Sequence, residues 1–105
     1  MTDRRIVITG IGVISPLGND LASTWEAMKA GRSGIDTIKS MDVTGYSTKI
    51  AGEVKDFDPA PYFRTPKDAR RVDRFTHFAM GAAGMALKDS GLDLEAEDKT
   101  RIGVM

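Results

Sequence analysis

The chain has 105 residues, of which 41% are hydrophobic and 29% charged, so it is long enough for one small domain or for part of a larger one. Its formal net charge is zero, which gives it no bulk electrostatic attraction to nucleic acid or to a membrane. It has no cysteine, which excludes disulfides, thiolate metal sites and a cysteine nucleophile among these residues. We find no signal peptide and no apolar run near the roughly 18 residues of a membrane span, and we expect a cytoplasmic α/β protein.

The first predicted element is a strand over residues 5–14, which is rich in β-branched side chains, as in strands buried on both faces. Its two glycines, Gly10 and Gly12, could belong to a dinucleotide-binding fingerprint. That fingerprint needs glycine or alanine at position 15, which is Ser15, and a helix that begins inside the motif. The context favours glycines that allow close packing against a neighbouring element, and a nucleotide-binding domain stays open as an alternative.

A short turn over residues 15–18, SPLG, leads into the first predicted helix. Asn19 or Asp20 can cap its start, and Gly31 marks its end. Apolar residues recur along it at helical spacing, and among them we expect Trp25 to be a core anchor.

Residues 34–45 are predicted to form a loop, and residues 48–54 a short strand. The longest helix is predicted over residues 66–90. Thr65 precedes a proline at the first helical position, which is a helix start, and Gly91 is a helix stop.

Two segments of the C-terminal half predict contacts with further elements. Residues 79–86, AMGAAGMA, are almost all small, and two glycines there cost about 1 kcal/mol each against alanine, so close packing should compensate. Phe75 and Phe78 are expected to make core or interhelical contacts. Residues 101–105, RIGVM, begin like a buried strand that stops while still apolar. We therefore expect residues 1–105 to be an incomplete portion of a domain, with exposed apolar edges.

Positive charge is concentrated around the start of the long predicted helix. Five cations fall within eleven residues, namely Arg64, Lys67, Arg70, Arg71 and Arg74. A helical wheel over residues 66–90 places Lys67, Arg70, Arg74 and His77 on one face, with Arg71 at its margin. The cluster is either a solvated face that Asp68 and Asp73 partly neutralise or a surface for an acidic partner. His77, the only histidine, is expected to be solvent-facing or partly packed.

The stretch RRIVITGIGVISPLGND, followed by STWEAMKAGRSGI, resembles the N-terminus of the β-ketoacyl-acyl-carrier-protein synthases, above all the type II condensing enzymes of fatty-acid synthesis. It is also similar to polyketide ketosynthases. The resemblance continues through YSTKIAGEVKDFDP and RVDRFTHFAMGAAGMALKDSGL to TRIGVM. It implies a thiolase-like α/β fold of five layers, α-β-α-β-α, in which residues 1–105 form the first part of the N-terminal half.

Members of that family condense an acyl group with malonyl-acyl carrier protein, using a cysteine and two histidines. The resemblance places all three beyond position 105, so it implies no catalytic residue, cofactor or metal site within 1–105 and no activity for these residues alone. It also implies a homodimer with no nucleic-acid or membrane partner. The choice between the fatty-acid and polyketide pathways, and the acyl chain length, stay open.

The same resemblance gives the basic cluster a role. Lys67, Arg70 and Arg71 match the basic positions at which the acidic acyl carrier protein, acyl- or malonyl-loaded, docks on this family. Arg74 lies on the same predicted face and is added to the docking set. The alternative is a non-catalytic binding module that contacts another acidic partner through the same basic helix.

Overall fold

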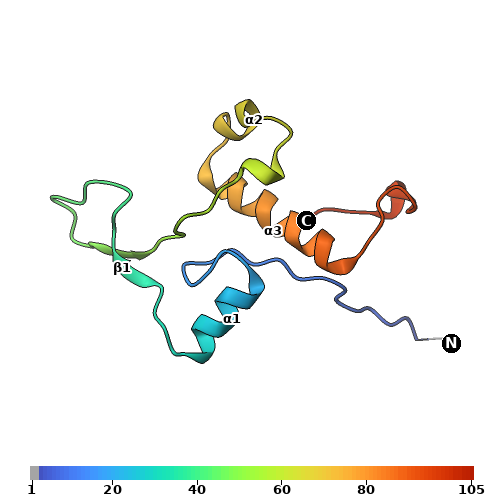
Figure 1. The fold of residues 1–105 in the computed structure, drawn as a ribbon, viewed down its shortest axis with the longest axis horizontal. Coiled ribbons are helices and arrows are strands. Elements are labelled where there is room, and N and C mark those ends of the chain that lie inside the picture. The colour runs from blue at the N-terminus through green and yellow to red at the C-terminus, as the bar shows by residue number, and fades with distance from the viewer. Residues whose placement is uncertain (1–2) are drawn as a thin grey trace.

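The computed structural model describes residues 3–105. The helices are α1 (Leu21–Lys29), α2 (Pro66–Arg70) and α3 (Arg74–Ser90), the strands are β1 (Ile35–Thr37) and β2 (Ile50–Gly52), and two 3₁₀ turns are η1 (Ala60–Tyr62) and η2 (Lys99–Arg101). The chain is open in shape, with extents of 59 × 37 × 23 Å (Figure 1). Its radius of gyration is 17.5 Å, against about 13 Å for a compact domain of this length.

The N-terminal segment is extended but pairs with no strand among the described residues, so the predicted strand over residues 5–14 is wrong for this structure. Ile6 is 89% exposed and Ile8 85% exposed, because among residues 3–105 no strand pairs with this segment. The segment instead runs along α3 (Figure 1).

The glycines of this segment are packed against α3. A Cβ atom on Gly12 would overlap the carbonyl oxygen of Ala82 and lie 2.8 Å from the amide nitrogen of Ala86, and one on Gly10 would overlap the Ala86 carbonyl. The predicted close packing is confirmed, and its partner is a helix. Gly10 and Gly12 therefore do not form the phosphate-binding loop of a dinucleotide fingerprint, since α3 packs against them and the next helix starts only at Leu21.

Helix α1 has the predicted ends. The Asp20 carboxylate accepts a 2.7 Å hydrogen bond from the Ser23 amide, and hydrogen bonding from Ser23 lowers the pKa of Asp20. Gly31, with φ +65°, follows the last turn in the left-handed conformation that favours glycine.

The expectation for Trp25 is wrong within the described residues. The buried residues of α1 are Thr24 and Ala27, which are 8% and 1% exposed, whereas Trp25 is 55% exposed. Thr24 Oγ1 donates to the carbonyl oxygen of Gly18 at 3.3 Å, so the face of α1 that meets the preceding turn is small and polar. The indole lies on another face.

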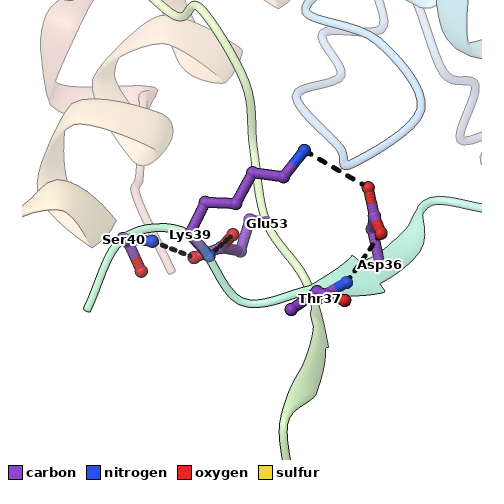
Figure 2. Close-up of polar contacts among 5 residues, drawn as sticks. All are labelled: Asp36, Thr37, Lys39, Ser40 and Glu53. Atoms are coloured by element: carbon purple, nitrogen blue, oxygen red, sulfur yellow. Dashed lines mark hydrogen bonds and ion pairs between the residues drawn. The ribbon is translucent and has the colours of Figure 1, made fainter. Parts of the chain in front are cut away.

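Strands β1 and β2 form an antiparallel pair in which Asp36 faces Ala51. Because β1 lies within residues 34–45, the predicted loop there is wrong in part, whereas the predicted strand over 48–54 is confirmed by β2. The Glu53 carboxylate ties the pair together, accepting bonds from the amides of Lys39 at 2.8 Å and Ser40 at 3.1 Å (Figure 2). Hydrogen bonding from Ser40, then from Lys39, lowers the pKa of Glu53.

The predicted helix over residues 66–90 is two helices. The chain leaves α2 at Arg71 and enters α3 through Asp73, whose φ of −78° and ψ of 164° are extended and not helical. Asp at this position favours a helix boundary over a helix interior. The predicted stop at Gly91 is confirmed by its φ of +66°.

The largest buried side chain is Phe57, which is 9% exposed. Its ring centroid lies 5.9 Å from that of Tyr62 and 5.8 Å from that of Phe78. A Cβ on Gly81 would lie 2.5 Å from the Phe57 ring, and one on Gly84 would lie 2.7 Å from the Tyr62 ring. The small residues of α3 therefore accommodate aromatic rings, as their composition predicts.

Two further expectations are wrong. Phe75 is 72% exposed and makes no core contact, while residues 102–105 form no strand and Val104 is 98% exposed. Across residues 3–105 the buried positions are Thr24, Ala27, Phe57, Ala69 and Gly81. Within the same residues no helix combines the length and apolar character needed to cross a membrane.

Candidate functional site: a basic surface around α2

The strongest candidate site is the basic surface, defined here as Arg64, Lys67, Arg70, Arg71 and Arg74. All five residues are exposed. Arg64 precedes α2, Lys67 and Arg70 lie within it, Arg71 is its C-cap, and Arg74 is the first residue of α3. The predicted docking residues therefore come from two helices and the bend between them.

Within α2 the cations share one side of the helix. Lys67 is separated from Arg70 and Arg71 by three and four positions, which places the three side chains next to one another on the helix surface. Like charges at this spacing destabilise a helix by about 0.2–0.5 kcal/mol per pair. On the other side, Ala69 is buried at 7% exposure, so the helix has one packed side and one charged side.

The start of α2 is fixed by Thr65. Its hydroxyl oxygen accepts a 3.2 Å hydrogen bond from the Asp68 amide and donates a 2.9 Å bond to the Asp68 carboxylate. Pro66 occupies the first helical position, where its missing N–H has no consequence. The Asp68 carboxylate thus belongs to the cap.

The basic surface keeps a net positive charge, because its five cations outnumber the two carboxylates between them, Asp68 and Asp73. Within residues 3–105, none of its five cations forms an ion pair, and the ion pairs present join Lys29, Lys39 and Lys99 to nearby carboxylates. This observation weighs against the interpretation that Asp68 and Asp73 neutralise the cluster, because neither makes an ion pair with it. The charges are free to meet an external anion.

Among the five cations, Arg74 is the one whose side chain contacts an aromatic ring within residues 3–105. Its guanidinium carbon lies 4.9 Å from the centroid of the Phe78 ring, a cation–π contact within α3. Because α2 and α3 are separate helices, the wheel that placed Arg74 on the face of Lys67 and Arg70 does not apply.

His77 joins the two helices. Its Nε2 lies 2.7 Å from the carbonyl oxygen of Ala69, and its ring meets Phe63 edge-on at 5.6 Å between centroids. His77 is half-buried, which confirms the partly packed alternative. Sequence patterns offered no signal for this contact, because it depends on the bend between α2 and α3.

A surface groove of about 400 Å³ lies at the β1–β2 pair. Its charged lining residues are largely occupied with one another. Glu53 holds two amides, and Lys39 Nζ lies 3.5 Å from the Asp36 carboxylate (Figure 2). Among residues 3–105, no group of three metal-binding side chains comes together.

Within residues 3–105, the basic surface presents five exposed cations. The Thr65 hydroxyl beside them is bonded to Asp68, and His77 Nε2 lies 2.7 Å from the Ala69 carbonyl oxygen. Such a surface attracts acidic partners over a distance that salt shortens.

Comparison with known proteins gives consistent results along the chain. The family model described as "Beta-ketoacyl synthase, N-terminal domain" matches residues 3–105. The 3-oxoacyl-[acyl-carrier-protein] synthase 2 of Vibrio cholerae serotype O1 is 47% identical over 104 residues, which are 99% of this chain and 25% of that protein. The protein of the same name from Staphylococcus aureus strain COL is 46% identical over 102 residues, 97% of this chain and 24% of that protein.

A solved structure is also similar. The ishigamide ketosynthase/chain length factor superposes with a TM-score of 0.78 at 37% sequence identity, over 90% of this chain and 23% of that chain. The present chain spans about a quarter of the length of the curated relatives that it matches.

Proposed function

The chain belongs to the family of β-ketoacyl synthase N-terminal domains, and on this premise we propose that it is part of a 3-oxoacyl-[acyl-carrier-protein] synthase of fatty-acid elongation. The observation that carries the proposal is 46–47% identity over 97–99% of the chain to proteins of that name. The superposition on a ketosynthase bears out the predicted thiolase-like α/β fold, of which these residues form a part.

We further propose that residues 1–105 are the first portion of the synthase N-terminal domain. The support is the coverage of the relatives, of which the chain matches only about a quarter, together with the bare N-terminal segment. Ile6 and Ile8 are exposed although their β-branched surroundings suit a buried strand.

In the proposed reaction, malonyl-acyl carrier protein loses carbon dioxide, and the electron pair of the broken C–C bond forms a new C–C bond to the carbonyl carbon of an acyl thioester. The C–S bond of that thioester breaks, its electron pair leaves with the sulfur as a thiolate, and the product is a 3-oxoacyl chain two carbons longer. The enzyme thiol that holds the acyl group must be activated, and backbone N–H groups must stabilise the developing oxyanion. Residues 1–105 contain no cysteine, so we expect them to be inactive alone.

The contribution proposed for these residues is scaffold and docking surface. The substrate partner is acyl carrier protein, an acidic protein, and the basic surface supplies exposed cations that no carboxylate within residues 3–105 pairs with. Lys67, Arg70 and Arg71 are the proposed core of the dock, with Arg74 beside them. We also propose a cytoplasmic homodimer, in keeping with the family resemblance.

The test uses the full-length synthase and a charge-reversal pair. Arg70→Glu with Arg71→Glu should weaken binding of acyl carrier protein by about tenfold or more at low salt, and the loss should shrink at high salt because exposed charges are screened. The matched control is Arg32→Glu with Lys88→Glu, which changes the net charge equally at two other exposed positions. Turnover of a small pantetheine thioester should be unchanged by either pair.

Two results would reject parts of the proposal. Equal affinity of the R70E/R71E pair and its control for acyl carrier protein would reject the docking role. The basic surface would then be a solvated face. A full-length protein that binds acyl carrier protein and yet makes no 3-oxoacyl product would favour the second candidate, a non-catalytic module for an acidic partner. The observation that favours this candidate is that the five cations form no ion pair within residues 3–105.

A further inference from the structure

Helix α2 is too short to hold its own shape. It has five residues, whereas isolated helices shorter than about 12–15 residues are marginal in water. The position of the cations on α2 therefore depends on the contacts that fix its two ends. Thr65 fixes the N-terminal end through its hydroxyl.

The C-terminal end is fixed by His77. The last four carbonyls of a helix have no partner within it, and the carbonyl of Ala69 is one of them. His77 Nε2 lies 2.7 Å from that oxygen. Since a carbonyl only accepts, the ring hydrogen is on Nε2 and the imidazole donates.

The other ring nitrogen supports this assignment. His77 Nδ1 is buried and has no hydrogen-bond partner within the described residues. A hydrogen on Nδ1 would be buried without an acceptor, so the tautomer with its hydrogen on Nε2 fits both ring nitrogens. The edge-on contact with Phe63 restricts the ring further.

We infer that His77 is a positioning residue for carrier-protein docking, because its Nε2–H holds the last turn of α2 and so fixes the backbone that carries Arg70 and Arg71. The inference rests on the proposed docking function. The held carbonyl belongs to Ala69, directly before Arg70. With that bond removed, the last turn of α2 frays, and a partner must order it on binding, which lowers affinity.

The experiment compares three variants of the full-length synthase. His77→Leu removes the donor, His77→Asn offers an amide too short to reach from the same Cβ, and His77→Gln places an amide N–H near the position of Nε2. We expect affinity for acyl carrier protein to fall about three- to tenfold in H77L and H77N and to be close to wild type in H77Q. Recovery of affinity in H77Q would show that His77 acts through its N–H donor and not through the volume of its side chain.

Two further measurements separate this inference from the dock itself. Hydrogen exchange of the amides of residues 68–71 should quicken in H77L and not in H77Q, whether or not any partner binds. In the R70E/R71E background, His77→Leu should cause no further loss of affinity, since the two changes act through the same contacts.

The outcomes are distinct. Wild-type affinity in both H77L and H77N, while R70E/R71E binds weakly, overturns the inference and leaves the dock intact. A full additional loss from His77→Leu in the R70E/R71E background also overturns it. Unchanged affinity in R70E/R71E rejects the dock and its positioning residue together, and the exchange measurement then still reports whether His77 holds α2. Should H77L not fold, H77N against H77Q decides the same question.

Discussion

The carboxylate of Asp89, near the end of α3, accepts a 2.9 Å hydrogen bond from the backbone N–H of Ile11, although 78 positions separate them in the chain. Together with the close approach of Gly10 and Gly12 to α3, this bond holds the N-terminal segment on the helix. The segment is thus fixed along one side by backbone contacts while the side chains of Ile6 and Ile8 remain exposed.

Replacing Gly12 by alanine should loosen this contact. The added Cβ would overlap the Ala82 carbonyl oxygen, which is backbone and cannot rotate away. Overpacking of this kind costs about 1–3 kcal/mol, so the full-length synthase should melt at lower temperature and the Ile11 amide should exchange faster. Gly103→Ala is the control, because a Cβ there meets nothing within 4 Å among residues 3–105. Unaltered exchange at Ile11 would mean that the segment is held in another way.

The β1–β2 pair should respond to acid through Glu53. Its folded pKa lies below the ordinary value of 4.5, so its hydrogen bonds to Lys39 and Ser40 are present above that value and are lost as pH falls through the lowered pKa. The amide chemical shifts of Lys39 and Ser40 should report this transition in an NMR titration. The transition should be missing in Glu53→Gln, whose side chain does not ionise. A midpoint above 4.5 would contradict the hydrogen-bonding pattern of Figure 2.

The 105 residues on their own should lack a sharp thermal transition. Few side chains are buried, and Ile6, Ile8 and Phe75 are each at least 72% exposed. An open chain of this kind has little apolar burial to set against its conformational entropy. Calorimetry should show a broad or absent transition, and an apolar dye should bind. A single cooperative melt would show that the chain folds independently.

Local chemistry predicted the ends of α1, the stop of α3 and the packing of Gly10 and Gly12 against a neighbour. Each of these depends on one or two residues, such as the Asp20 cap. The short strand β1 escaped prediction because Ile35–Thr37 has no alternating pattern, and its partner β2 lies more than ten residues away.

The burial of side chains was harder to predict from the sequence than the positions of the helices and strands. A β-branched run or a lone tryptophan indicates that a surface suits burial, yet it does not say which element covers it. Trp25 is half exposed for that reason. For the candidate site, the sequence predicted where the cations lie along the chain. The contact between His77 and Ala69 depends on the bend around Asp73, and a continuous helical pattern over residues 66–90 gave no sign of that bend.

The cation–π contact of Arg74 affects how freely the charges of the basic surface can move. The Arg74 guanidinium carbon lies 4.9 Å from the centroid of the Phe78 ring, so this contact favours one orientation of the side chain before any partner arrives. Within residues 3–105, the side chains of Lys67, Arg70 and Arg71 have no comparable support. Within residues 3–105, the surface therefore combines one cation that rests on an aromatic ring with cations whose side chains have no such contact, so the five charges differ in how freely they can move.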